Sequence, residues 1–296
     1  MTTQAVSGRR YFTKAWLLEQ KSLIALLVLI AIVSTLSPNF FTVNNLFNIL
    51  QQTSVNAIMA VGMTLVILTS GIDLSVGSLL ALGAAIGAVT GVIVAKGRVQ
   101  AFIATLVMML LLRGVTMVYT DGSPVNTGFT DNADLFGWFG IGRPLGVPTP
   151  VWIMAIVFIA AWYMLHHTRL GRYIYALGGN EAATRLSGIS VSKVKIIVYS
   201  LCGLTASLAG IIEVARLSSA QPTAGTGYEL DAIAAVVLGG TSLAGGKGRI
   251  VGTLIGALIL GFLNNGLNLL GVSSYYQMIV KAVVILLAVL VDNKKQ

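Results

Sequence analysis

The apolar sequence is divided by residues 166–195, HHTRLGRYIYALGGNEAATRLSGISVSKVK, which form the one long polar stretch between two apolar blocks. This stretch contains five Arg and Lys residues and two His residues, but only a single acid, Glu181. Loops that are rich in Lys and Arg stay on the cytoplasmic side of a membrane. The sequence therefore predicts that residues 166–195 form a cytoplasmic loop, and this loop orients every other segment.

The middle of the loop predicts one short helix, from Glu181 to Ser187. Asn180 is suited to cap its first turn by accepting a backbone N–H, and Gly188 is suited to the left-handed conformation that ends a helix. Glu181 and Arg185 stand four residues apart in the favourable order, with small apolar residues on the other face. Such a helix is shaped to dock in a groove of another protein. The alternative is a solvated connector with an ordinary Asn cap.

Composition defines the class of protein. The chain has 296 residues, of which 56% are hydrophobic and 10% are charged, whereas about a quarter of the residues in a soluble domain are charged. We therefore expect an all-α, polytopic helical membrane protein, a single domain over residues 1–296 with about 8–10 transmembrane or re-entrant helices. The 33 glycines fit this class, because small residues let helices approach closely in a membrane.

The charged residues set the orientation of the chain ends and loops. Residues 1–21 are polar and basic, and Lys294 and Lys295 follow the last apolar run, so both termini are predicted to be cytoplasmic. Residues 120–150 carry three acids and one basic residue, which is typical of an outer loop. The formal net charge of +9 is concentrated at span ends and in one loop, where it anchors topology. Nucleic acid is therefore not an expected partner.

Residues 69–78, TSGIDLSVGS, break an apolar span with an acid. Exposing Asp73 to lipid at the bilayer centre would cost several kcal/mol, so its side chain should face a cavity or a partner. Asp73 is either the N-cap of the helix that follows or part of a broken helix beside a substrate pathway. Both interpretations remain open, and Asp73 and Ser75 are candidate pathway residues.

Two glycine-rich stretches suggest an internal repeat. Residues 68–77 and 237–246 align with a constant offset, and each precedes a glycine-spaced span. Residues 231–244 are too short to cross a membrane as an ordinary helix, so they should form a broken or re-entrant piece. A repeat of two halves places a substrate site where the broken helices meet. The alternative is chance similarity between two stretches of small residues.

Three amides in one apolar run are further pathway candidates: Asn264, Asn265 and Asn268. Their side chains either hydrogen-bond a polyhydroxylated sugar or bridge helices, which is the commoner use. Motifs for other chemistry are missing. The stretch GGTSLAGGKG lacks the spacing of a phosphate-binding loop, because Lys247 is followed by Gly248 instead of Ser or Thr. We expect no catalytic site, no metal site and no cofactor.

Three stretches resemble, in the same order, the permease subunits of the ribose-type class of bacterial ATP-binding-cassette sugar importers. They are GGNEAATRLSGI (residues 178–189), TSGIDLSVGS (residues 69–78) and LGGTSLAGGKGRIVGTLIGA (residues 238–257). The first resembles the coupling-loop signature of the family, and the similarity runs over nearly the whole chain. The residues that this resemblance assigns to ATPase coupling are Gly179, Asn180, Glu181, Ala182, Ala183, Arg185, Leu186, Ser187 and Gly188.

The resemblance implies a pore-forming, non-catalytic subunit in the bacterial inner membrane that carries a pentose, most similar to the permeases for ribose. It also implies a separate ATP-binding subunit, a periplasmic sugar-binding protein and a second copy of the permease as partners. A self-sufficient secondary sugar transporter is the alternative. That class needs intramembrane acids to couple to an ion gradient, and Asp73 and Glu213 are the only candidates.

The number of crossings conflicts with the charge pattern in the first half of the chain. If residues 22–36, 53–70 and 76–95 each cross, Lys96 and Arg98 lie outside and every later loop is inverted. The acidic loop would then be cytoplasmic and the basic loop external. Residues 53–98 must therefore cross an odd number of times, so that Lys96 and Arg98 stay inside.

Comparison with the family suggests a cause for this conflict. The chain lacks the equivalent of about one helix, roughly 20–25 residues, around Leu82 and Gly83. We expect the loops after Tyr119 to keep the family orientation and residues 53–95 to become partly re-entrant. Strained packing should then lower stability or activity relative to a full-length relative.

Overall fold

The chain was analysed as a computed structural model. The structure describes residues 21–36, 42–71, 84–121, 125–126, 138, 142, 144–217, 219–220, 228–243 and 245–293. The predictions for residues 1–20, for Asp73 and Ser75, and for the deletion around Leu82 and Gly83 lie outside the described residues.

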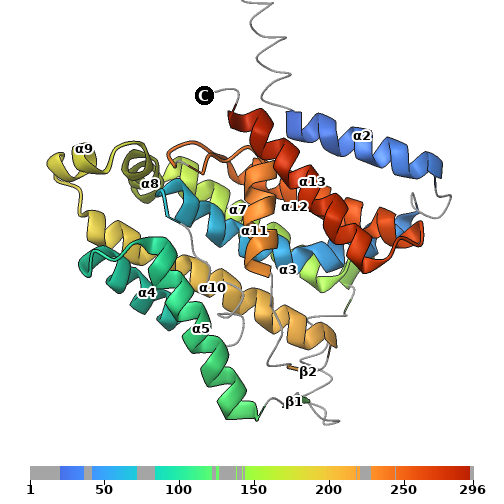
Figure 1. Ribbon diagram of the computed structural model, residues 1–296, viewed down its shortest axis with the longest axis horizontal. Coiled ribbons are helices and arrows are strands. Elements are labelled where there is room, and N and C mark those ends of the chain that lie inside the picture. The colour runs from blue at the N-terminus through green and yellow to red at the C-terminus, as the bar shows by residue number, and fades with distance from the viewer. Residues whose placement is uncertain are drawn as a thin grey trace, which may run out of the picture.

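Helices make up most of the described chain, which confirms the prediction of an all-α polytopic protein (Figure 1). The helices are α2 (Lys21–Leu36), α3 (Val43–Leu68), α4 (Ala84–Lys96), α5 (Ala101–Thr120), η2 (Pro144–Gly146), α7 (Thr149–His167), α8 (Arg169–Gly179), α9 (Glu181–Leu186), α10 (Val191–Leu217), α11 (Tyr228–Leu238), α12 (Ile250–Leu269) and α13 (Ser274–Asn293). Among the described residues, α3, α5, α7, α10 and α12 are long and apolar enough to cross a membrane. Shorter apolar segments lie in α2 and α13.

Helix α3 is the centre of the packing. It contacts α7, α8, α10, α11 and α12. In its most apolar 18-residue window 78% of the residues are buried, compared with 22% for α5 and 28% for α7. The outer helices α5 and α7 expose large apolar side chains such as Val118 and Ile159. Those exposed faces suit contact with lipid, whereas α3 is enclosed by protein.

One prediction about α3 was wrong. The sequence analysis took residues 53–70 as the crossing segment, but the structure joins them to the residues before them in one helix of 26 residues that begins at Val43. No Pro or Gly separates them, and the Thr42 hydroxyl caps the helix by accepting from the Asn45 N–H at 3.2 Å. The Asn45 amide donates to Asn265 of α12 at 3.0 Å. This bond gives the polar first turns of α3 a partner inside the protein.

The structure also contains a helix in the basic loop that the sequence analysis did not predict. Helix α8 lies before the short helix, and its buried face is formed by Ile174, Leu177 and Gly171. These positions are spaced three residues apart, so they lie on one face of an amphipathic helix. Gly171 packs against the backbone of Leu165 at the end of α7, where a Cβ atom would clash. Helix α8 is therefore held tightly against the end of a span.

The ends of several helices meet at one end of the molecule, which we call the junction end. A cavity of about 550 Å³ there is lined by the C-terminal ends of α3 and α4, the N-terminal ends of α5 and α10, and α9. Helices α3 and α4 therefore finish at the same end. The described helix α4 has 13 residues, or a length of about 20 Å. The residues just before it, 72–83, lie outside the described part of the chain, so the partly re-entrant path of residues 53–95 stays a prediction.

The opposite end of the molecule is joined by other contacts. The short strands β1 (Val125–Asn126) and β2 (Ser219–Ala220) pair there, beyond the ends of α5 and α10. Gln277 at the start of α13 donates to Asn268 at the end of α12 at 2.6 Å. Helices α5, α10 and α12 thus run from the junction end to the opposite end.

Candidate functional site

The short helix α9 projects from the junction end of the molecule (Figure 1). The Asn180 side chain accepts from the backbone N–H of Ala183 at 3.0 Å, and Gly188 has a φ of 86°, so both predicted helix signals are confirmed. Leu186 is 89% exposed, and Ala182 and Ala183 are also exposed. These three side chains make a small apolar surface, which we call the α9 face.

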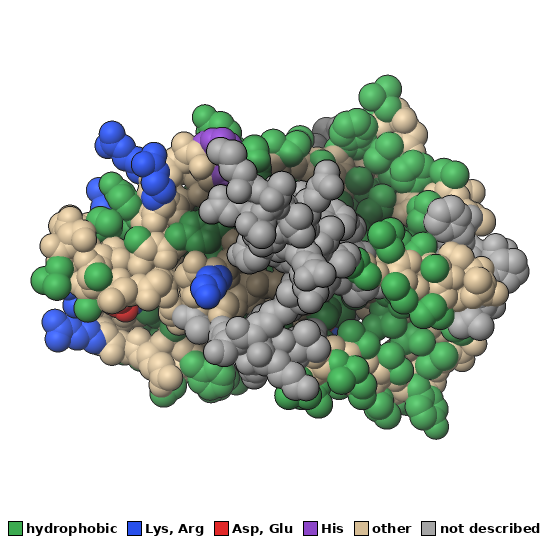
Figure 2. Space-filling model, turned by 90° about the horizontal axis from the view of Figure 1, so that it is seen from above, with side chains coloured by type: hydrophobic (Ala, Val, Ile, Leu, Met, Phe, Trp, Pro, Cys, Tyr) green, Lys and Arg blue, Asp and Glu red, His purple; other side chains and the backbone are tan. Residues whose placement is uncertain are grey.

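Charged side chains surround the α9 face. Glu181 pairs with Arg185 at 3.4 Å, as the spacing of four residues predicted. It also pairs with Lys195 at the start of α10 at 3.1 Å, a contact between elements that the sequence analysis missed. Figure 2 shows basic side chains gathered at the end of the molecule where α8 and α9 lie. The first ion pair lies within α9, whereas the second ties the short helix to α10.

Three backbone segments meet directly behind α9. The N–H of Gly246 donates to the carbonyl of Leu68 at 3.0 Å, and the Ser70 hydroxyl donates to the carbonyl of Gly178 at 3.1 Å. A Cβ atom at Gly178 would overlap the Leu68 carbonyl and lie 2.5 Å from the nitrogen of Gly246. We call this contact between the ends of α3 and α8 and the loop before α12 the backbone junction. Only one residue separates α9 from α8. A displacement of α9 therefore moves α8 and, through these contacts, the end of α3 and the loop before α12.

The two halves of the suggested repeat end in the same kind of turn. In α3, Ser70 has a φ of 66° and the N–H of Gly71 bonds the carbonyl five residues earlier at 3.1 Å. After α11, Gly240 has a φ of 93° and the N–H of Thr241 makes the equivalent bond at 3.2 Å. This is the Schellman arrangement of a helix C-terminus. The matching turns lie 170 residues apart, one residue more than the offset in the sequence alignment.

A hydrogen bond connects α8 to the loop that leads into α12. The Tyr175 hydroxyl donates to the carbonyl of Gly248 at 2.6 Å. Burial raises the pKa of Tyr175 above its ordinary value of 10, although the nearby charge of Arg249 opposes this shift. The protonated hydroxyl donates this bond, so its contribution is complete below pH 10 and is lost only as the pH rises through the raised pKa.

We expect Tyr175→Phe to lower the rate of transport several-fold without preventing membrane insertion, because one buried hydrogen bond contributes about 0.5–1.5 kcal/mol. The ratio of wild-type to variant rates should be the same at pH 6 and pH 9, since the hydroxyl stays protonated throughout. Initial uptake rates at several pH values would check this. A ratio that approaches one at pH 9 would contradict the assigned role of the hydroxyl.

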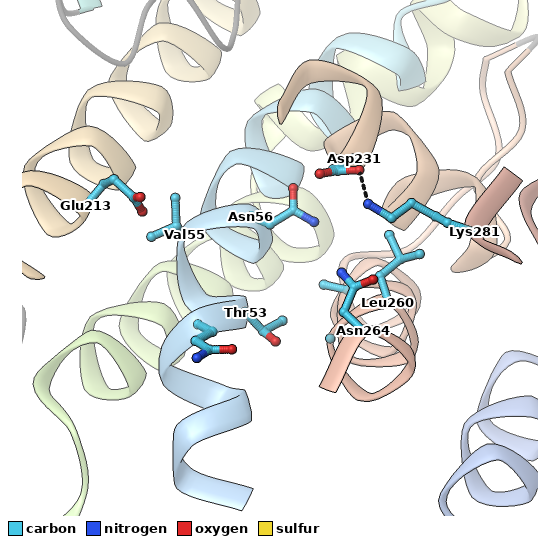
Figure 3. A pocket seen from close by; sticks show the side chains of 11 residues that line it. Thr53, Val55, Asn56, Glu213, Asp231, Leu260, Asn264 and Lys281 are labelled. Atoms are coloured by element: carbon cyan, nitrogen blue, oxygen red, sulfur yellow. Dashed lines mark hydrogen bonds and ion pairs between the residues drawn. The ribbon is translucent and has the colours of Figure 1, made fainter. Parts of the chain in front are cut away.

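A second cavity lies among the long helices, at a distance from the backbone junction. It has a volume of about 160 Å³ and contains charged and amide side chains from five helices, α3, α10, α11, α12 and α13 (Figure 3). We call it the polar pocket, and it is lined by Gln52, Thr53, Val55, Asn56, Glu213, Asp231, Ala257, Leu260, Gly261, Asn264 and Lys281. Lys281 reaches from α13 to Asp231 on α11, at 2.9 Å.

The structure separates the three asparagines that the sequence grouped together. Asn264 lines the polar pocket. Asn265 is buried and accepts from Asn45 of α3, whereas Asn268 accepts from Gln277 of α13. The last two therefore bridge helices, whereas Asn264 lines the polar pocket.

Several residues of the polar pocket were not found by the sequence analysis. Asp231 and Lys281 were missed, although a charged residue inside an apolar segment is itself a signal. Glu213, which was considered only as an ion-coupling candidate, is 5% exposed and also lines the pocket. Within the described part of the chain, no group of three or more His, Cys, Asp or Glu side chains is arranged to hold a metal ion.

Long apolar helices, broken helix ends that meet through glycine backbone and an exposed basic end define a multi-pass membrane permease. The comparisons with known proteins support the same class. Residues 79–289 match the family described as branched-chain amino acid transport system / permease component. The chain belongs to this family, whose members are the membrane subunits of ATP-binding-cassette importers. It is a non-catalytic subunit, and an ATP-binding subunit and a substrate-binding protein are its partners.

Individual relatives cover most or all of the chain. It is 89% identical to the ribose import permease protein of Escherichia coli strain K12, with both chains covered completely. It is 64% identical to the ribose import permease protein of Haemophilus influenzae, over 94% of each chain. It is 40% identical to the D-allose transport system permease protein of Escherichia coli strain K12, over 90% of this chain and 89% of the relative. No solved structure matches the chain.

The first of these alignments also measures the expected deletion. It spans 321 positions, whereas the chain has 296 residues, so about 25 positions have no counterpart here. This is the length of one membrane-spanning helix. The predicted size of the gap is therefore confirmed, and its place around Leu82 and Gly83 stays a prediction.

Proposed function

We propose that this chain forms the membrane pathway through which ribose is imported across the bacterial inner membrane. The observation that carries the proposal is the 89% identity to a ribose import permease over the complete chain. The identity is 64% and 53% for two further ribose import permeases. It falls to 40% and 34% for permeases named for D-allose and xylose transport. This order supports ribose over other sugars.

The proposal includes the residues that receive the ATP-binding subunit. The α9 face is exposed, small and apolar, and the ion pair between Glu181 and Lys195 ties α9 to α10. Such a face fits a shallow groove on a partner. Movement of the partner then reaches α3 and α12 through the backbone junction. On this proposal residues 179–188 couple ATP hydrolysis to the opening and closing of the pathway.

The orientation follows from the charges at the junction end. Arg98, Arg185 and Lys195 line the cavity there, and Lys247 and Arg249 lie in the loop before α12. By the rule that basic loops remain inside, the junction end is cytoplasmic, and so are the N- and C-termini. We further propose that two copies of the chain assemble as a homodimer around one pathway, as the resemblance to the family implies.

Reconstitution tests the function. Proteoliposomes that contain this chain, its ATP-binding subunit and the sugar-binding protein should accumulate labelled ribose only when ATP is supplied. Unlabelled ribose should compete more strongly than D-allose or xylose. Uptake without ATP that is abolished by an ionophore would instead identify a secondary transporter. Accumulation of D-allose or xylose in preference to ribose would reject the proposed substrate.

The orientation has its own test. Single cysteines are placed at Asn126, beyond α5, and at Ser192, at the start of α10, in a Cys202→Ser background. An impermeant thiol reagent added to intact spheroplasts should label the Asn126→Cys protein, and the Ser192→Cys protein should react only after lysis. Labelling in the reverse order would show that the deletion inverts the second half of the chain.

A further inference from the structure

We propose that the polar pocket of the permease binds the hydroxyl groups of one sugar molecule. This inference rests on the proposed function, because the sugar is the transported substrate. The pocket is lined by side chains from α3 and from the four consecutive helices α10, α11, α12 and α13. A ligand that contacts several helices at once couples their movements. A pocket between these helices therefore suits a molecule that is transported.

Two buried oxygen atoms in the pocket lack a hydrogen-bond partner in the part of the chain that the structure describes, and a ligand would supply one. The Thr53 hydroxyl and the side-chain carbonyl of Asn56 are buried, and neither has a hydrogen-bond partner within the described residues. Thr53 is only 5% exposed. An unsatisfied buried polar group costs about 1–3 kcal/mol. A sugar hydroxyl that donates to these oxygens removes that cost.

Two of the three ionisable side chains that line the pocket, Asp231 and Lys281, pair with each other, and this pair favours a neutral ligand. The carboxylate of Asp231 is already neutralised by Lys281 at 2.9 Å, so the pair attracts no further ion strongly. A carboxylate still has free acceptor sites and an ammonium group still has free donors. Figure 3 shows Asn56 and Asn264 beside this ion pair, on α3 and α12. Each amide also offers both a donor and an acceptor.

This mixture of donors and acceptors matches a polyhydroxylated molecule. Every sugar hydroxyl donates one hydrogen bond and accepts others. An ion is bound by several groups of the opposite charge, and an apolar molecule makes no use of these polar side chains. Val55, Ala257 and Leu260 supply apolar wall for the C–H faces of a sugar ring. A binding site with apolar walls and a few placed polar groups is the usual form for a small molecule.

The depth of the pocket agrees with a place on the transport path. Thr53 precedes Leu68 at the junction end by 15 residues, or about 22 Å along α3. Asn264 follows Ile250 by 14 residues, or about 21 Å along α12. With the junction end in the cytoplasm, the pocket lies in the outer half of a hydrocarbon core of about 30 Å. That is the half into which the binding protein releases its sugar.

A matched pair of variants on α12 tests the proposal. Asn264→Leu should lower the maximal rate of ribose uptake at least tenfold in the reconstituted importer, at saturating sugar-binding protein. Asn268→Leu makes the same change one turn along the helix, outside the pocket, and should retain at least half of the rate. Thr53→Val, which is nearly isosteric, should behave like Asn264→Leu. Equal rates for Asn264→Leu and Asn268→Leu would overturn the proposal.

A binding measurement separates this proposal from the proposed function. Asn56→Cys in a Cys202→Ala background places a thiol in the pocket, and its rate of modification by a small maleimide is followed with and without ribose. Ribose should slow the reaction at least threefold, and sodium chloride should not. Protection by salt alone, or none by ribose, would overturn the pocket assignment. Wild-type uptake of ribose would meanwhile remain as evidence for the function.

Discussion

Replacing Gly178 by Ala should lower ribose transport at least tenfold while the protein still inserts into the membrane. The added Cβ atom meets the Leu68 carbonyl and the backbone nitrogen of Gly246, and neither is the movable end of a side chain. The backbone junction must therefore open. The two hydrogen bonds that close it, from Gly246 and from Ser70, contribute about 1–3 kcal/mol together.

The measurement for Gly178→Ala is ATP-driven uptake together with ATP hydrolysis by the assembled importer. We expect hydrolysis to continue without matching uptake, because the ATP-binding subunit still docks on α9 but α3 no longer follows it. Gly114→Ala is the matched control, since a Cβ atom in that helical position meets nothing within 4 Å. Normal uptake by Gly178→Ala would show that the junction transmits no movement.

The second large effect is expected for Ala182→Glu, which puts a charge on the α9 face. If this face is buried against the ATP-binding subunit, the carboxylate loses its water without gaining a partner, at a cost of several kcal/mol. Since 1.4 kcal/mol corresponds to a factor of ten, binding of the partner should weaken by more than tenfold. Transport and co-purification of the partner should fall together.

Folding of the Ala182→Glu variant should be unaffected, because Ala182 is exposed in the isolated subunit. Ala182→Ser is the control, since it is small and uncharged, and it should retain most of the transport. The amount of protein in the membrane fraction checks insertion in both cases. Unchanged co-purification with Ala182→Glu would make α9 a solvated connector, the alternative that the sequence left open.

Local features of this protein could be predicted from its sequence. The Asn180 cap, the ion pair between Glu181 and Arg185 and the end of α9 at Gly188 each depend on residues within about two turns of helix. The overall class followed from composition, because 10% charged residues rule out an ordinary soluble domain. Such signals need no knowledge of distant contacts.

The remaining features depend on contacts between distant residues. The start of α3 near Val43 is stabilised by the hydrogen bond from Asn45 to Asn265, a residue more than 200 positions away in the sequence. In the polar pocket, Asp231 of α11 pairs with Lys281 of α13, and both line the pocket together with residues of α3. No sequence motif marks these residues as neighbours. Helix α8 is an exception. Its apolar residues repeat at helical spacing in the sequence, but the surrounding basic residues favoured the prediction of a polar loop.

The backbone junction holds one end of α3, so this helix can act as a lever that pivots at the junction end. Leu68 is held there by Gly246, and Thr53 lies about 22 Å further along the same helix. A tilt of about 5° at the fulcrum moves Thr53 by about 2 Å, which is enough to break the hydrogen bonds around a bound sugar. If the polar pocket holds the sugar as proposed, a small rotation imposed by the ATP-binding subunit would move the pocket further than it moves the junction. The sugar would then be released by this movement instead of by a change in the chemistry of its site.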